Sequence, residues 1–188
     1  MVVSKKRMSS RMVSKQQQLR WLQEGRGQGQ LDTYKPFLNV RDNKSLTERS
    51  SRVYGYKTQR THHLFSDLEL ALFLALDRIQ DIEDIREQIP LDLETTVQIA
   101  EDLKIPHPIE QNVHQIITST FFIVNHSPLK PPCFVVKALK SIHLDQKRTI
   151  AQLELERRYW EQKNIPWFLF TEKDISSTAI DNIKWLYP

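Results

Sequence analysis

The sequence predicts an α/β fold with a mixed central sheet flanked by helices. Two observations point to this class. Some segments carry apolar residues at helical spacing, while others are rich in β-branched and aromatic residues. The two kinds follow each other in the order helix, strand, helix, strand, strand, helix, strand, helix, at Ser66–Arg78, Ile82–Leu91, Leu93–Leu103, Gln115–Asn125, Cys133–Leu139, Asp145–Lys163, Pro166–Thr171 and Asp174–Leu186.

The first of these helices combines a start signal with an apolar stripe. Ser66 is followed three residues later by Glu69, which is a capping-box pattern. Leu68, Leu72 and Leu76 then recur at helical spacing. One side of this helix is therefore expected to face the core.

Residue composition and the positions of helix- and strand-breaking prolines predict the later elements. The second helix stops before Pro106, because proline cannot continue a helix. The strand that follows contains the run Ile116–Val124, which is mostly β-branched and aromatic. A proline-rich turn around Pro131 separates it from the next strand, and the third helix offers Tyr159 and Trp160 to the core. Before all of these, Met12–Gln23 is expected to form a short helix and Val53–Tyr56 a strand fragment.

Charge is distributed unevenly along the chain. Residues 1–60 carry 14 Lys/Arg against 4 Asp/Glu, a balance of +10, whereas the remainder carries 13 against 19, a balance of −6. We expect residues 1–30 to be a basic, partly disordered segment and residues 31–188 to be one domain. A basic segment favours a polyanion such as DNA, although a solvated tail is the alternative. The candidate DNA contacts are Lys5, Lys6, Arg7, Arg11, Arg26, Lys57 and Arg60.

Several classes of protein are disfavoured. No apolar run approaches the roughly 20 residues that cross a bilayer, and Met1–Lys15 lacks the apolar region of a secretory signal. Cys133 is the single cysteine and cannot form an internal disulfide, which fits a reducing cytoplasm. We therefore expect a cytoplasmic protein with no membrane partner.

Other polar residues have ordinary interpretations. The six histidines and Cys133 show no ligand spacing typical of zinc. His62 and His63 are expected to be a polar surface pair. Glu154 and Glu156, followed by two arginines, are expected to form a solvated helix face with charge pairs.

Five stretches resemble the TnsA endonuclease family, and they occur in unbroken order from about Glu24 to Tyr187. Each motif alone is weak, but the series is specific. The stretches are Glu24–Gly29 (EGRGQG), Thr61–Ala71 (THHLFSDLELA), Asp84–Leu91 (DIREQIPL), Leu153–Lys163 (LELERRYWEQK) and Ile165–Phe168 (IPWF).

The resemblance implies a restriction-endonuclease-like domain over residues 31–188. Proteins of this family cut the 5′ ends of a cut-and-paste transposon, while a partner transposase of the retroviral-integrase type joins the 3′ ends. The implied partners are therefore transposon-end DNA and that transposase subunit. An ATP-dependent transposition regulator is less supported, because longer relatives contact it through a C-terminal domain, whereas this sequence ends soon after the nuclease-like region.

The resemblance also assigns a catalytic site. Such nucleases gather carboxylates around a divalent cation, which activates water and offsets charge on the phosphate. Glu69 matches the family's helix glutamate and Lys137 its catalytic lysine. Thr120 stands where the family has a metal-binding aspartate, and Val135 stands where it has glutamine, two positions before the lysine and hence on the same strand face. Without the resemblance, Glu69 is a cap residue, Lys137 a solvated edge lysine and Thr120 an ordinary strand residue.

Two functions follow from these departures. One is an active endonuclease, with Mg²⁺ held by Glu69, a backbone carbonyl near Val135 and waters, with Lys137 activating water and Thr120 as an impaired ligand. The other is a silent DNA-binding and assembly subunit that positions transposon ends for the transposase. Loss of a carboxylate ligand weakens transition-state stabilisation at a magnesium site, so the sequence favours the second function, with weak or absent Mg²⁺ binding.

Overall fold

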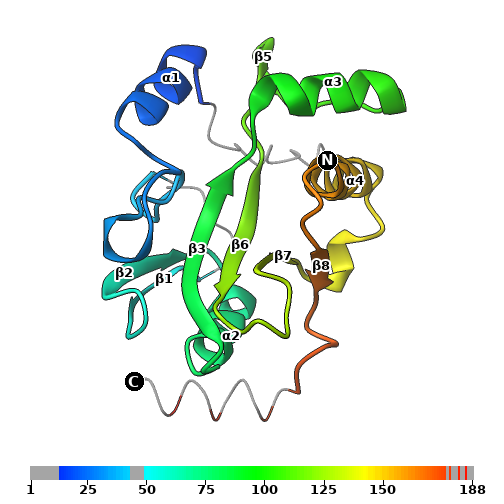
Figure 1. The fold of residues 1–188 in the computed structure, drawn as a ribbon. Helices are drawn as coiled ribbons and strands as arrows, with labels where there is room; N and C mark the ends of the chain where they lie inside the picture. The colour runs from blue at the N-terminus through cyan, green and yellow to red at the C-terminus, as the bar shows by residue number, and fades with distance from the viewer. Residues whose placement is uncertain (1–12, 43–48, 177, 179–181, 183–184, 186–188) are drawn as a thin grey trace, which may run out of the picture.

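The structure is a computed structural model that describes residues 13–42, 49–176, 178, 182 and 185. Helices lie on both sides of a central sheet (Figure 1). In chain order the elements are α1 (Lys15–Gln23), η1 (Leu31–Thr33), β1 (Ser51–Gly55), β2 (Arg60–Leu64), α2 (Asp67–Leu76), β3 (Ile82–Pro90), α3 (Leu93–Leu103), β4 (Ile109–Glu110), β5 (Val113–His114), β6 (Thr118–Asn125), β7 (Cys133–Ala138), η2 (Ser141–His143), α4 (Lys147–Gln162) and β8 (Trp167–Phe170).

The central sheet has the strand order β3-β6-β7-β8. β3 and β6 are antiparallel, as are β6 and β7, whereas β7 and β8 are parallel and are joined through α4. The predicted mixed sheet flanked by helices is confirmed, and this arrangement is consistent with a restriction-endonuclease-like domain.

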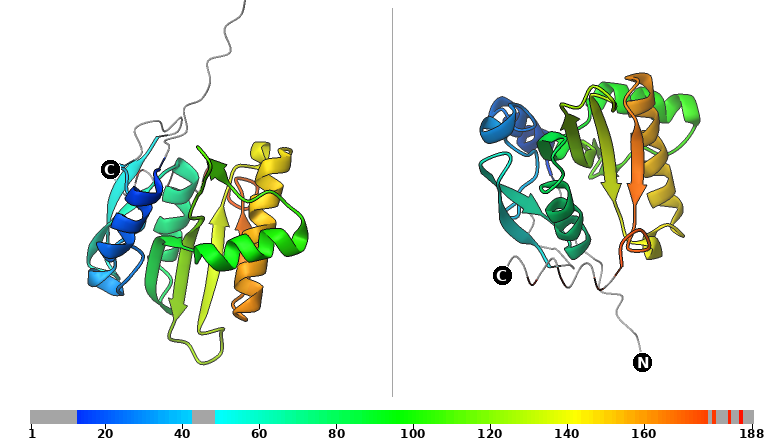
Figure 2. Two further views of the ribbon diagram at one scale, coloured as in Figure 1. Left: turned by 90° about the horizontal axis from the view of Figure 1, so that it is seen from above. Right: turned by 60° about the horizontal axis from the view of Figure 1, so that its bottom comes forward.

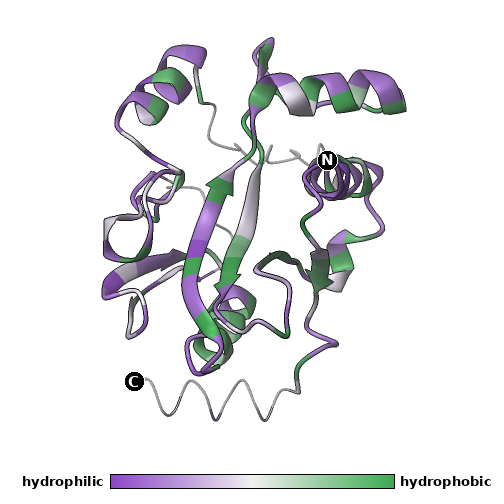
Figure 3. Cartoon of the chain, viewed as in Figure 1, coloured by the Kyte–Doolittle hydropathy of each residue, from purple (hydrophilic) through white to green (hydrophobic). Residues whose placement is uncertain are grey.

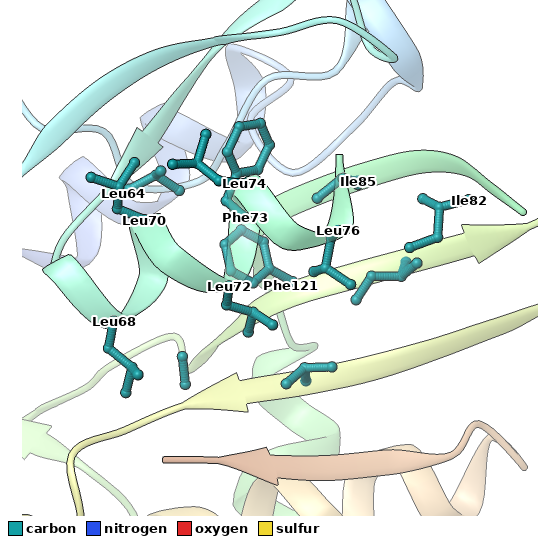
Figure 4. Close-up of a cluster of buried hydrophobic side chains, with 13 residues drawn as sticks. Leu64, Leu68, Leu70, Leu72, Phe73, Leu74, Leu76, Ile82, Ile85 and Phe121 are labelled. Carbon is teal, nitrogen blue, oxygen red and sulfur yellow. The ribbon is translucent and has the colours of Figure 1, made fainter. Parts of the chain in front are cut away.

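One face of the sheet packs against α2. The apolar side chains of this helix meet those of β3, β6 and β7 in a buried cluster that includes Phe73, Ile85 and Phe121 (Figure 4). Nearly all of α2 is buried. Figure 3 shows that α2 is more hydrophobic than α4, which is mostly hydrophilic. Burial of so many apolar side chains supplies much of the stability of this half of the molecule.

The other face packs against α3 and α4. Val135 of β7 joins Ile99, Leu155 and Trp160 in a second cluster, while the next residue, Val136, belongs to the first. This alternation places the two clusters on opposite faces of the sheet. Figure 2 accordingly shows α2 and α4 on opposite sides of it.

The predicted elements from residue 66 to residue 171 are all present. Helix α3 has the predicted bounds, and α2, β3, β7 and α4 differ from theirs by one or two residues. The predicted strand at Gln115–Asn125 begins later, at Thr118. The predicted helix at Asp174–Leu186 falls largely on residues outside those described.

Two hairpins were not predicted. The strand fragment at Val53–Tyr56 is β1, and it pairs with β2, a segment of largely polar residues. β4 and β5 form a two-stranded hairpin joined by Gln111 and Asn112. Both joining residues have positive φ, 47° and 63°, as the tight turn of a two-residue hairpin requires.

The N-terminal helix packs against the body of the molecule. Ser14 caps α1 by accepting a hydrogen bond from Gln17 N. Trp21 is 3% exposed, and the buried Gln18 side chain bonds the backbone of His114 and Ile116. Residues on both sides of the expected boundary at residue 30 are therefore part of one packed unit. None of the helices among the described residues has the length and apolar character needed to span a bilayer.

Candidate active site

Lys137 forms an ion pair with a buried acid on the neighbouring helix. Its Nζ lies 3.0 Å from Glu156 Oε2 and donates a 2.8 Å hydrogen bond to the carbonyl oxygen of Thr118. Glu156 is 1% exposed, and its other oxygen accepts a hydrogen bond from Trp167 Nε1 at 3.1 Å. The lysine charge is thus matched inside the protein by a carboxylate from α4.

The pair follows from the faces that β7 and α4 present to each other. Lys137 is two residues after Val135, so both point toward α4. The expectation of a solvated face holds for Glu154, which pairs with Arg157 and Arg158. For Glu156 it is wrong, because this residue is buried on the inner side of α4, where it pairs with the Lys137 ammonium and accepts from the Trp167 ring N–H.

A pocket of about 370 Å³ opens beside Lys137. Glu156, Thr118 and Gln18 contribute to its lining, and Arg148 of α4 adds a second cation. None of the other three positions assigned from the family motif lines it. The pocket therefore mixes two cations, Lys137 and Arg148, with two acids, Glu110 and Glu156, and one of these acids is paired with Lys137.

Thr120 lies close to Lys137 in the sheet. It is 3% exposed, and its hydroxyl oxygen accepts a 3.1 Å hydrogen bond from the backbone N–H of Ala138, the residue after the lysine. The bond forms where the regular pairing of β6 and β7 ends, at Phe121 and Val136. The hydroxyl is neutral and takes part in holding the two strands together.

Val135 is a core residue. It has no exposed surface and packs among the apolar residues between the sheet and α4. Although it shares a strand face with Lys137, its side chain carries no atom that could bind a metal ion. This position therefore contributes packing alone through its side chain.

Glu69 takes part in the start of α2. Its backbone N–H donates to Ser66 Oγ at 3.1 Å, and its Oε2 accepts from the backbone N–H of Phe65 at 2.7 Å. This reciprocal arrangement satisfies two N–H groups at the helix start, close to a capping box. Glu69 is 8% exposed, so the carboxylate is held largely inside the protein.

The structure thus brings two of the four assigned positions together. Thr120 and Lys137 are neighbours across β6 and β7, and Val135 shares their sheet but points into the apolar core. Glu69 lies on α2, the helix that covers the opposite face from α4. The family's site requires Glu69 to reach the same place from that side.

The side chains of Thr120 and Val135 add no carboxylate to a magnesium site. Mg²⁺ prefers oxygen ligands, usually with one or two carboxylates. Thr120 offers a neutral hydroxyl that is already bonded, and Val135 offers nothing. Across the part of the chain that the structure describes, no three His, Cys, Asp or Glu side chains gather as they would to hold a metal.

The residues predicted to contact DNA lie in different environments. Lys57 is half-buried, and its backbone N–H bonds Asp77. Arg26 donates to Asp42 at 2.5 Å and stacks over the Trp21 ring, which gives its guanidinium a role in holding the N-terminal helix. Four other predicted DNA contacts, in the N-terminal segment, lie outside the described residues: Lys5, Lys6, Arg7 and Arg11.

Arg60 is at odds with its expected role on DNA. Its guanidinium is buried and makes two hydrogen bonds, of 2.8 and 2.6 Å, with the Glu87 carboxylate. It also stacks on the ring of Tyr34. A guanidinium committed in this way has no surface to offer a phosphate, so its role is internal.

His62 joins the same buried network, contrary to its expected surface position. Its Nδ1 lies 2.7 Å from Glu87 Oε2, and its Nε2 lies 2.6 Å from Thr58 Oγ1. Burial by itself would raise the pKa of Glu87, but the His62 ring and the Arg60 guanidinium outweigh it and lower that pKa to about 2. The network joins β2 to β3 in the interior.

Comparison with known proteins agrees with the resemblance seen in the sequence. Residues 80–172 match the family model described as TnsA-like endonuclease N terminal. The chain is also 46% identical over 169 residues to the Transposon Tn7 transposition protein TnsA of Escherichia coli. That alignment covers 89% of this chain and 61% of the relative's length, so the chain spans less than two thirds of the protein it matches.

Proposed function

Because the chain belongs to the TnsA family of transposon endonucleases, we propose that it acts at transposon DNA ends as the nuclease-fold subunit of a cut-and-paste transposase, with its own 5′-strand cleavage weak or lost. Its role is then to bind DNA and to help assemble the complex. A transposon that relies on it leaves the 5′ strands uncut and produces cointegrates.

The chemistry around Lys137 carries this proposal. The lysine is paired with Glu156, the hydroxyl of Thr120 is bonded to the backbone, and Val135 is apolar. A hydrolytic site needs negative charge to hold a cation and a free group to activate water. Thr120 and Val135 supply no carboxylate and Lys137 is held in an ion pair, which supports a silent or severely weakened site with little affinity for Mg²⁺.

The proposed partners follow from the family and from the charge. They are transposon-end DNA, an integrase-type transposase subunit and, with less support, an ATP-dependent transposition regulator. The excess of basic residues among the first 60 favours contacts that are mainly to the DNA backbone.

Strand nicking on a supercoiled plasmid that carries the transposon end tests the proposal. We expect the assembled complex to leave the 5′ ends intact in Mg²⁺ or Mn²⁺. The double variant Thr120→Asp, Val135→Gln should gain nicking at those ends, and this gain should vanish when Glu69→Ala is added. A double variant that folds and still does not nick counts against our account of the damage.

A matched control tests whether the gain of nicking depends on the position of the new carboxylate. Thr118→Asp introduces a carboxylate on the same strand, but at the residue whose carbonyl oxygen binds Lys137. It should not restore nicking. Melting temperatures of all variants establish that each one is folded under the assay conditions.

One observation favours the second candidate, an active endonuclease that uses Glu69 and Lys137. Glu156 is an acid within 3.0 Å of Lys137, and it could substitute for the missing aspartate. In that case the wild-type complex nicks the 5′ ends and Glu156→Gln abolishes the nicks, whereas Glu154→Gln, on the outer side of α4, leaves them unchanged.

A further inference from the structure

Two histidine rings meet beside α3, away from the candidate active site. His107 Nδ1 lies 3.1 Å from His114 Nδ1, and the carbonyl oxygen of Pro108 lies 3.1 Å from the same atom of His107. His107 is buried and His114 is half-buried. His107 Nδ1 therefore lies close to a second imidazole nitrogen and to a carbonyl oxygen, and these three atoms define a meeting point.

The β4–β5 hairpin produces this meeting. Its tight turn at Gln111 and Asn112 folds β5 back, so that His114 pairs with Ile109, two residues beyond His107. Sequence spacing does not reveal the pair, because the six residues between the histidines form most of a strand–turn–strand hairpin rather than one helix or loop.

The hydrogen bond between the Thr96 hydroxyl and its own helix favours one tautomer of His107. The Thr96 hydroxyl donates its one hydrogen to the carbonyl oxygen of Leu93 at 3.0 Å. Its 3.1 Å contact with His107 Nε2 therefore requires that Nε2 carry a hydrogen. In the neutral ring this leaves a lone pair on Nδ1, directed at the meeting point.

Neutral rings do not fill this arrangement with hydrogens. His114 Nδ1–H can donate to the Nδ1 lone pair of His107, but the carbonyl oxygen of Pro108 then faces that lone pair with no hydrogen between them. Placing a cation at the meeting point turns all three contacts into favourable ones. The cation could be a proton on His107 or a metal ion.

We propose that His107 Nδ1, His114 Nδ1 and the Pro108 carbonyl oxygen form a binding site for a borderline divalent metal ion of the zinc type. Imidazole nitrogens suit zinc, copper and nickel, whereas magnesium and calcium prefer oxygen. Two nitrogens that bind one tetrahedral zinc ion at about 2.0–2.1 Å are about 3.4 Å apart. The 3.1 Å separation is close to this value, so a small movement of His114 completes the site.

The surroundings of His107 are those of a metal-binding histidine. Such a ring commonly donates its second N–H to an oxygen, which fixes its orientation and tautomer, and Thr96 Oγ1 provides that oxygen. The site draws on α3 through Thr96 and on the hairpin through His114, so a bound ion ties these two elements together. Solvent completes the coordination, because within the described residues no third His, Cys, Asp or Glu side chain joins a metal cluster.

Calorimetric titration of the full, untagged chain with zinc chloride near neutral pH tests the site. We expect one zinc ion per chain with a micromolar dissociation constant. His114→Gln should abolish this binding, and Thr96→Val should weaken it by about 10- to 100-fold, because it removes the oxygen that orients His107. His126→Gln, at an exposed histidine elsewhere, is the matched control and should bind as the wild type does.

Nitrogen-15 NMR of the histidine side chains separates a metal ion from a proton. Zinc should shift the Nδ1 signals of His107 and His114 and leave their Nε2 signals in the protonated range. If zinc leaves both rings unchanged at millimolar concentration, or if His114→Gln binds zinc as tightly as His126→Gln, the site is not a metal site. A doubly protonated His107 in the metal-free chain near neutral pH would assign the cation as a proton and overturn the proposal.

Discussion

Lys137 Nζ and Glu156 Oε2 lie 3.0 Å apart, and the carboxylate is 1% exposed. A buried ion pair is neither a strong stabiliser nor a reactive group: its main energetic feature is the cost of breaking it. The same carboxylate holds Trp167 Nε1, so β7, α4 and β8 meet at this one acid. At this point the structure departs most clearly from the site that the family motif implies.

Removing the lysine alone should be costly. Lys137→Met leaves the Glu156 carboxylate buried without a cation, and we expect a loss of about 3–5 kcal/mol in the free energy of unfolding. Adding Glu156→Gln should recover part of this loss, because the amide still accepts from Trp167 Nε1 and carries no charge. Urea unfolding measures both variants, and losses that simply add would show that the two side chains are not coupled.

Glu69 should have a stability role that is separable from any catalytic one. Glu69→Ala removes the acceptor of the Phe65 N–H and should cost about 1 kcal/mol, whereas Glu69→Gln keeps an acceptor and should cost much less. Asp92→Ala, at the N-cap of α3, is a matched loss of a cap at a residue outside the four assigned site positions. Equal unfolding free energies for the alanine and glutamine variants of Glu69 would contradict the capping role.

The buried Glu87 should make stability fall in acid. Its pKa is about 2 in the folded protein, whereas an ordinary glutamate has a pKa near 4.5, so between these values the unfolded chain binds a proton that the folded chain does not. The stabilisation is therefore present above about pH 4.5 and lost as the pH falls toward 2.

Unfolding free energies measured across this pH range check the assignment. Glu87→Gln should flatten the dependence, while Glu94→Gln, at an exposed glutamate of α3, should leave it nearly unchanged. A pH dependence that survives intact in Glu87→Gln would place its source in other carboxylates.

The basic N-terminal residues should set the salt dependence of DNA binding. Each phosphate contact contributes a slope of about 0.9 to log affinity against log salt. Replacing the four residues Lys5, Lys6, Arg7 and Arg11 by glutamine should therefore reduce that slope, by up to about 3.6 if all four bind phosphates.

Arg60→Gln is the informative contrast in the same assay. The buried guanidinium bonds Glu87, so this change should lower the melting temperature without altering the salt slope. An unchanged slope in the four-residue variant, or a reduced slope in folded Arg60→Gln, would reverse our assignment of which charges meet DNA.

Local pattern was sufficient to predict most of the fold. α2 was predicted closely because Ser66 and Glu69 mark its start, and α3 because Pro106 marks its end. β2 and the β4–β5 hairpin were missed because short polar strands show no clear periodicity in the sequence. They form because they pair with a neighbouring strand.

The buried polar residues could not be predicted in the same way. His62 depends on Glu87, which is 25 residues away, and Glu156 depends on Lys137, which is 19 residues away. By sequence alone a histidine before a helix or a glutamate on a charged helix belongs on the surface. In the folded protein both residues are instead buried beside a charged partner from another element. The same folding places Lys137, expected to carry a free amine, in an ion pair with Glu156.

We propose that Glu69, Thr120, Val135 and Lys137 together bind a magnesium-like cation weakly or not at all. A crystal soaked in Mn²⁺ measures this directly, because the anomalous signal of manganese locates the ion without assumptions about its ligands. We predict no manganese peak between Thr120 and Lys137. A strong peak there with a complete set of oxygen ligands, including Glu69 or Glu156, would contradict the account.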